Sequence, residues 1–271
     1  MKRPSGRSRG VGAPDDTQPS RRQSRPVALK PVTGPRISRH EREQMIVREA
    51  VGFFAEQGFE GQTRELARRL GVTQPLLYRY FPDKATLIDR VYREVFLDRW
   101  RPQWQAWIVD ASRPLPERLI RFYQDYARLI LSYEWVRLFM FSGLKGLDIA
   151  KHYAEMIFAR VYPSVIGEMR AAEGCQSLAE HPMTDGEAEH LWALHAAIFY
   201  LGIRRWVYRL PVPEDQDAAV AARVRAFLDG APAVMHAAAA SAGGRSQLVE
   251  AMMRPGESGA GWSLMDPLSL D

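Results

Sequence analysis

Apolar residues recur with helical spacing from residue 38 to about residue 240, whereas the alternation typical of β-strands is weak throughout. No internal repeat or heptad array is visible. The pattern therefore predicts an all-α fold. Capping residues, glycines and prolines divide it into about nine helices.

The first predicted helix follows Ser38 and ends at Gly58. Glu41 stands three residues after Ser38, which is the spacing of a capping box. Between these limits Ile46 and Phe53 mark one apolar face of the helix. Glycine is common just beyond the end of a helix, so the pattern places the boundary there.

Two short helices are predicted next, at 63–70 and 74–81, around a tight turn. Ala67 is small where the two helices must cross closely, and Gly71 permits the turn four residues later. Leu77 and Val72 then point back toward the core. This spacing predicts a helix-turn-helix unit.

Further helices are predicted toward the C-terminus. Asp83 can cap a fourth helix that runs toward Trp100. A second capping box, Thr184 with Glu187, opens a long apolar helix. The remaining segments are predicted at 116–133, at 135–143, at 147–173 with Pro163 breaking or kinking it, at 184–210, and from near Pro213 to 240.

The outward side chains around the tight turn suit DNA. Thr73 can cap the second short helix, whose first turn then points toward a major groove. Arg and Gln form paired hydrogen bonds with guanine and adenine, and Leu contacts the thymine methyl. The residues predicted to face bases are Arg64, Gln74, Pro75 and Leu76. The residues predicted to contact phosphates, which set register, are Thr63, Tyr78, Tyr80 and Lys84.

Three short sequence motifs follow one another in this region. They are Phe53-Phe54-Ala55-Glu56-Gln57-Gly58-Phe59, then Leu66-Ala67 with Leu70-Gly71-Val72, then Leu77-Tyr78-Arg79-Tyr80-Phe81 followed by Lys84 and Leu87. With them, residues 38–90 resemble the DNA-binding domain of the TetR family of bacterial transcriptional regulators. The resemblance implies that Tyr78 and Lys84 grip phosphates and that Arg64, Gln74 and Pro75 face base edges. Gln62 departs from the pattern, because many members have Thr there.

The resemblance also implies an architecture. It predicts a DNA-binding domain at 37–85 and a helical effector-binding and dimerisation domain at 86–240. Helices near 185–210 and 214–240 would pair with those of a second copy, so that a homodimer binds a palindromic operator. A small apolar or aromatic ligand would release this repressor from its double-stranded DNA, with the fourth helix as the link between domains.

Aromatic residues are dense in the second predicted domain. Between Phe96 and Tyr208 lie 19 of the chain's 28 aromatic residues, enough to line an apolar pocket. The candidate ligand-binding residues are Trp104, Tyr126, Phe139, His152, Met156, His195 and Phe199. The alternative is that most of them are core or dimer-interface residues.

Charge is concentrated at the N-terminus. Residues 1–36 hold nine Lys or Arg and two Asp, a net charge of +7 in a chain whose total is +5. Their Gly-, Pro- and Ser-rich composition predicts a disordered basic arm, which either adds phosphate or minor-groove contacts or is a solvated tail. Residues 241–271 have a similar composition without the charge and are expected to form a flexible tail.

Several functions find no support. No apolar run is long enough to span a membrane, no secretory signal is visible, and the single Cys175 suits a reducing compartment, so a cytoplasmic protein is expected. No nucleophile elbow, phosphate loop or dinucleotide motif is present, which predicts neither an enzyme nor a cofactor. Glu187 and His190 form one Glu-x-x-His pair, expected at the surface and without a metal.

Two other functions stay open on the sequence. One is a transcriptional activator, or a regulator that needs no ligand. The other is a protein-interaction adaptor that uses the helix-turn-helix only as a scaffold and binds no specific DNA. Tyr78, Lys84 and Arg64 argue against the adaptor, which has no reason to keep all three groups facing outward.

Overall fold

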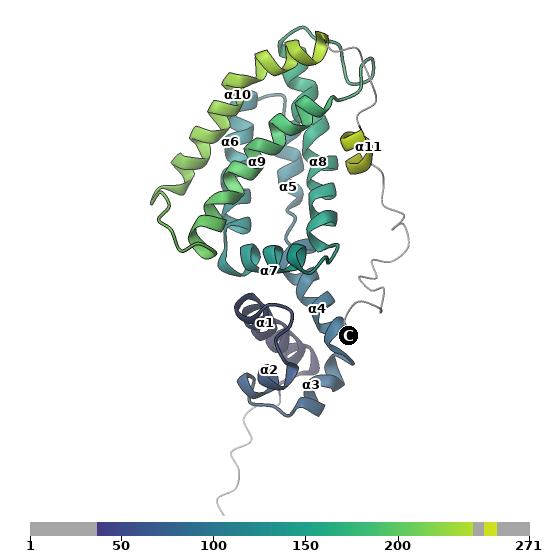
Figure 1. Cartoon of the computed structure of the whole chain (residues 1–271), viewed down its shortest axis with the longest axis vertical. Coiled ribbons are helices and arrows are strands. Elements are labelled where there is room, and N and C mark those ends of the chain that lie inside the picture. Colours follow the sequence, from purple (N-terminus) through teal and green to yellow (C-terminus); the bar gives the residue numbers. More distant parts are fainter. Residues whose placement is uncertain (1–36, 241–246, 254–271) are drawn as a thin grey trace, which may run out of the picture. The chain divides into compact units, whose positions relative to one another are not determined.

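Figure 1 traces the described part of the chain, residues 37–240 and 247–253, in a computed structural model. These residues form α-helices and one π-helix, with no strand among them, so the predicted all-α fold is confirmed. The arm expected at 1–36 and most of the tail expected at 241–271 lie outside the described residues. None of the described helices is both long and apolar enough to cross a membrane.

The predicted helix-turn-helix unit is present. Leu77 is buried, Val72 packs against the same core, and Ala67 is 2% exposed where the two short helices meet. The unit consists of α1 (Arg39–Gln57), α2 (Thr63–Arg69) and α3 (Gln74–Tyr80).

Capping and glycine turns fix the ends of these helices as predicted. The Ser38 hydroxyl accepts a hydrogen bond from the Glu41 backbone N–H at 3.1 Å, and the Glu41 carboxylate accepts one from the Ser38 N–H at 2.8 Å. Gly58 and Gly71 have φ of +72° and +65°. Side chains oppose this left-handed backbone, which is why glycine stands at both turns.

The fourth predicted helix changes type along its length. It begins as α4 (Lys84–Tyr92) and continues into the π-helix η1 (Arg93–Leu97), so the helical segment stops shortly before Trp100. In η1 the Asp98 N–H donates to the carbonyl five residues back, at 2.9 Å. π-Turns are rare and frequently occur at functional sites.

Two short helices were not predicted, and the first of them begins at Pro102. Pro102 occupies the first turn of α5 (Pro102–Val109), where its missing N–H costs nothing. Only Trp104 and Ile108 of this helix are buried. Trp107 and Val109 are apolar as well, so the segment shows no single apolar face, which is why the pattern failed to reveal the helix.

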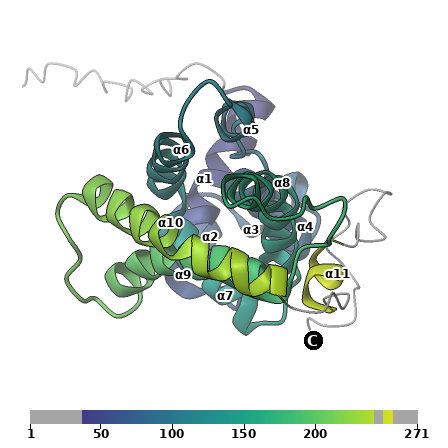
Figure 2. The same cartoon turned by 90° about the horizontal axis from the view of Figure 1, so that it is seen from above.

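The remaining helices surround the aromatic core. Helix α10 packs closely on both α6 and α9, and Figure 2 shows these two on either side of it. Helix α7 packs against α1, α8 and α9. The bounds are α6 (Leu115–Ile130), α7 (Tyr133–Leu144), α8 (Ile149–Ala172), α9 (Asp185–Trp206) and α10 (Gln216–Ala240).

Helix α8 runs through Pro163 as one element, so the predicted break there is wrong. Proline removes one backbone hydrogen bond and costs about 3 kcal/mol inside a helix. Tyr162 and Val165, on either side of the proline, are completely buried. Burial of such side chains contributes roughly 1.5–3 kcal/mol each and offsets the cost.

The helix predicted to start near Pro213 is present, whereas the short helix after it was not predicted. Helix α10 begins at Gln216, three residues after Pro213, because Asp215 accepts a hydrogen bond from the Ala218 N–H at 2.8 Å. Helix α11 (Gln247–Met253) lies within the segment expected to be a flexible tail. The tail is therefore structured at these residues, whose Val249 and Met252 pack against the core.

Glu187, expected at the surface, is completely buried beside Arg170. Two hydrogen bonds of 2.5 and 2.6 Å join the guanidinium to the carboxylate. The guanidinium also donates to the carbonyls of His181 and Pro182, at 2.5 and 3.1 Å. Burial raises the pKa of Glu187, but the hydrogen bonds from Arg170 and Thr184 outweigh this effect and leave the pKa lowered. The pair ties the connection between α8 and α9 to the core.

Candidate nucleic-acid interface

Three polar side chains meet where α2 begins and α3 crosses it. The Thr63 and Tyr78 hydroxyl oxygens are 2.9 Å apart, and the Gln74 amide donates to Thr63 at 3.1 Å. The same amide lies 3.5 Å from the Tyr78 hydroxyl. Thr63 is buried, whereas Gln74 and Tyr78 are half-buried. The structure thus joins two predicted phosphate ligands and one predicted base-reading side chain in a single hydrogen-bonded cluster.

The start of α3 is held by its cap. Thr73 has an extended backbone, and its hydroxyl accepts a hydrogen bond from the Leu76 N–H at 3.4 Å. Pro75 lies in the first turn, where a proline fits without loss of a hydrogen bond. Pro75 is exposed and Leu76 is half-buried. The first turn of α3 therefore presents one rigid and one apolar side chain beside Gln74.

The other predicted DNA ligands lie around this cluster. Arg64 is exposed in the first turn of α2. Tyr80 is half-buried, and the Arg39 guanidinium lies 5.9 Å from the centre of its ring. Lys84 is the first residue of α4, and Asp83 before it accepts a hydrogen bond from the Thr86 N–H at 2.6 Å. This hydrogen bond lowers the pKa of Asp83.

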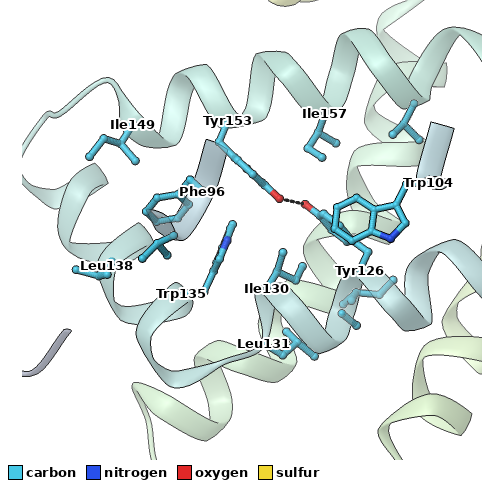
Figure 3. Close-up of a cluster of buried hydrophobic side chains, with 14 of the residues drawn as sticks. Phe96, Trp104, Tyr126, Ile130, Leu131, Trp135, Leu138, Ile149, Tyr153 and Ile157 are labelled. Atoms are coloured by element: carbon cyan, nitrogen blue, oxygen red, sulfur yellow. Dashed lines mark hydrogen bonds between the residues drawn. The ribbon is translucent and has the colours of Figure 1, made fainter. Parts of the chain in front are cut away.

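The predicted effector residues belong to a close-packed aromatic core. Figure 3 shows Tyr153 of α8 pointing toward Tyr126 of α6, with the two hydroxyl oxygens 2.9 Å apart. The Trp104 indole N–H donates to Asp125 at 2.7 Å. Burial raises the pKa of Tyr126 and Tyr153 far above the usual value, so both phenols are neutral. Among the candidate pocket residues, Trp104 and His195 both contact Tyr126, and Phe139 contacts Phe199.

Some buried polar atoms in this core lack hydrogen-bond partners. They include the Trp135 indole nitrogen, the His195 Nδ1 atom and the Tyr162 hydroxyl. Burial lowers the pKa of His195 to about 4, which keeps its imidazole neutral. A buried polar atom without a partner is costly and is a position where a ligand group or water gains a hydrogen bond.

A comparison with protein families decides what the first helices are. Residues 46–91 match the family described as "Bacterial regulatory proteins, tetR family". The match runs from α1 to α4 and includes the hydrogen-bonded cluster of α2 and α3. These helices are therefore similar to the DNA-binding domain of TetR-family regulators. The matched family is one of regulatory proteins.

One curated relative matches part of the chain. The tetracycline repressor protein class A from transposon 1721 of Escherichia coli is 32% identical over 92 residues, which cover 31% of this chain and 42% of the repressor. The chain thus spans less than half the length of this relative.

Two solved TetR-family regulators are among the structures to which the chain is similar. One, from Pseudomonas syringae, has 18% identity and a TM-score of 0.45 over 69% of this chain and 95% of its own. The other, from Streptomyces coelicolor, has 15% identity and a TM-score of 0.48 over 78% of this chain and 94% of its own.

Sequence analysis missed the contacts between this TetR-family domain and α7. Arg137 of α7 donates to the carbonyl oxygens of Ala55 and Glu56 at the end of α1. Lys145, just after α7, forms an ion pair with Glu60 and lowers its pKa. These residues are about 80 positions apart along the chain, so no local pattern could connect them.

Proposed function

We propose that the chain is a homodimeric, sequence-specific transcriptional regulator of the TetR type. It binds a palindromic operator as a repressor and releases it when a small apolar or aromatic ligand binds. In this proposal residues 37–85 bind DNA, residues 86–240 bind the effector and the second copy, and the protein works in the cytoplasm. The match to the TetR family over α1 to α4 supports the DNA-binding part.

The hydrogen-bonded cluster of Thr63, Gln74 and Tyr78 is the observation that carries the proposal. It holds Gln74 at the start of α3, the end of a recognition helix that enters the major groove. The Gln74 amide can exchange its internal partners for adenine N7 and N6. Proposed base contacts are Arg64, Gln74, Pro75 and Leu76, with Thr73 as the cap. Proposed phosphate contacts are Thr63, Tyr78, Tyr80 and Lys84.

Helices α9 and α10 suit the proposed dimer. They pack on each other, and each also carries exposed alanines that leave room for a close neighbour. They include Ala193, Ala196 and Ala197 on α9 and Ala222, Ala226 and Ala233 on α10. Pairing of two helices from each copy gives a four-helix bundle about a two-fold axis. Such an axis places two α3 helices to contact two half-sites about one turn of DNA apart.

The aromatic core offers the proposed effector contacts. The candidates are Trp104, Tyr126, Phe139, His152, Met156, His195 and Phe199. A ligand that enters between them would rearrange the core and so shift α7, whose Arg137 bonds to the end of α1. A differential affinity of roughly 1–3 kcal/mol between two arrangements would change operator binding about 5- to 150-fold.

Selection of bound fragments from genomic DNA at physiological salt tests the proposal. We expect a palindrome with half-sites about one helical turn apart, and footprints on both halves. Recovery of no sequence above background, together with binding that disappears as salt rises, would support the adaptor instead.

Substitutions in the cluster test the roles of its side chains. Gln74→Ala should relax the preference at one base position by roughly 1–3 kcal/mol. Lys84→Gln should weaken binding to every sequence and reduce the slope of log affinity against log salt by about 0.9. Competition binding with single-base operator variants, at several salt concentrations, measures both effects.

Matched controls lie away from α2 and α3. Gln103→Ala changes an exposed glutamine of α5, and Lys151→Gln changes an exposed lysine of α8. Neither should alter operator binding. The roles proposed for Gln74 and Lys84 are wrong if either variant behaves like its control.

A further inference from the structure

A cavity of about 410 Å³ lies between α1, η1, α6 and the start of α7. None of the aromatic residues proposed above for the effector lines it. Four arginines line this cavity: Arg48, Arg99, Arg101 and Arg128. Two glutamates are also present, which leaves a formal charge of +2 on the lining.

The arginines differ in how far their charge is already neutralised. Arg101 pairs with Asp125 at 2.7 Å, and Arg128 pairs with Asp217 at 2.5 Å. Arg99 has only a 3.9 Å contact with the Glu94 carboxylate, and its Nε donates to the Glu94 carbonyl. Arg48 forms no ion pair among the described residues, so its guanidinium has donors to offer to an anion.

Glu94 is shared with an arginine that lies outside the cavity. Its carboxylate already lies 3.1 Å from Arg90, outside the cavity lining. The other cavity glutamate, Glu134, stands in the first turn of α7. Oxyanions bind arginine through paired, charge-assisted hydrogen bonds, which are the stronger class of hydrogen bond.

The remaining wall is apolar. Val51, Val95, Leu129 and Trp135 contribute to it. At Gly52 of α1 the wall is open, because a Cβ atom placed there would meet no other atom within 4 Å. The lining thus combines arginines with aliphatic and aromatic side chains. Such a lining matches a molecule with an anionic group and an apolar body.

We infer that this cavity binds a small amphipathic organic anion, a carboxylate or sulfonate with an aromatic or aliphatic body. Arg48 and Arg99 hold the oxyanion, and Val51, Leu129 and Trp135 cover the apolar body. The inference rests on the proposed function only in treating this ligand as an effector.

The position of the cavity explains how such a ligand acts. Arg48, Val51 and Gly52 belong to the TetR-family domain, whereas the other lining residues belong to η1, α6, α7 and the connection to α5. A ligand that contacts both sides favours one angle of α1 against α6 and α7. It therefore changes the population of operator-binding dimers.

Titration calorimetry with 1-naphthoate and its neutral isostere 1-naphthamide tests the site on the full chain. We expect naphthoate to bind about 10-fold more tightly than naphthamide, because only the carboxylate forms charge-assisted hydrogen bonds with the arginines. Arg48→Gln should remove most of this difference. Arg79→Gln, an exposed arginine of α3, is the control and should retain it.

A second pair of variants tests the cavity without changing charge. Gly52→Leu fills the open wall and should abolish naphthoate binding, whereas Gly143→Leu should not. Gly143 is also a helical glycine with open space at its Cβ position, but it lies outside the cavity. Melting curves show whether both variants fold, and Arg48→Gln decides alone if Gly52→Leu does not.

Three results would overturn the inference: no binding of naphthoate at millimolar concentration, equal binding of the acid and the amide, or equal effects of the two leucine substitutions. DNA measurements separate this inference from the proposed function. If naphthoate binds in the cavity but no operator can be selected, the site stands and the regulator fails. If an operator is selected and naphthoate does not bind, the proposed regulator stands and the anion site fails.

Discussion

Replacement of Arg170 by Met is expected to lower the free energy of unfolding by about 3–5 kcal/mol. The substitution leaves the carboxylate of Glu187 buried without its cation, and it removes the donor that the carbonyls of His181 and Pro182 use. Urea unfolding at neutral pH, followed by circular dichroism, measures the loss. Combining Arg170→Met with Glu187→Leu should recover part of it, because no unpaired charge is then buried.

Arg118 provides a matched control. It is 2% exposed, compared with 3% for Arg170, but the side chain of its ionic partner Glu168 is 40% exposed, whereas Glu187 is completely buried. Arg118→Met removes the hydrogen-bond donor of backbone carbonyls but leaves no charge buried. The expected loss of unfolding free energy is therefore only about 1–3 kcal/mol. Equal losses in the two variants would show that the charge of Glu187 is not the cause.

The stability of the native chain should fall as the pH is lowered from about 6.5 to about 4. Burial lowers the pKa of His195 to about 4 from a usual value of 6.5. The unfolded chain therefore binds a proton that the folded chain does not accept in this interval, and protonation favours unfolding. The loss approaches about 3 kcal/mol at pH 4, at about 1.4 kcal/mol per pKa unit.

His195→Leu should remove this contribution. At pH 7 the variant should be as stable as the native chain or more stable, because the unpaired Nδ1 atom is replaced by an apolar group. Urea unfolding at pH 7, 6, 5 and 4 gives the slope for each protein. His40→Gln, at an exposed position in α1, is the control for the loss of a histidine. An equal change of slope in both variants contradicts the role given to His195.

Elements with a local signal were predicted well. Two capping boxes, at Ser38 and Thr184, and the glycine at 71 fix helix ends by contacts within three or four residues, and all are present. Helix α5 was missed because its apolar residues do not form a single face, and helix α11 because it lies in a Gly- and Ser-rich stretch. Glu187 was misplaced because its partner Arg170 is 17 residues away, beyond any helical repeat.

The two candidate sites also differ in whether their residues are close together in the sequence. The DNA-contact candidates stand within one stretch of chain, so their spacing alone grouped them, and the structure brings Thr63, Gln74 and Tyr78 together. The cavity collects residues from 48 to 135. An arginine in a sequence is most often a solvated surface charge, and only the packing of α1 against the later helices distinguishes Arg48 from the others.

The π-helix at Arg93–Leu97 has a consequence for orientation. A wide turn holds one residue more than an α-helical turn, and each α-helical residue advances the side chains by about 100° around the axis. Deletion of one residue from this segment would restore a regular α-helix. The side chains of Val95 and Phe96 would then point about 100° away from their present directions in the core. The one extra residue therefore sets the rotation about the helix axis between two segments. One is α4, which begins at Lys84, and the other is the connection that places Arg99 and Arg101 at the cavity.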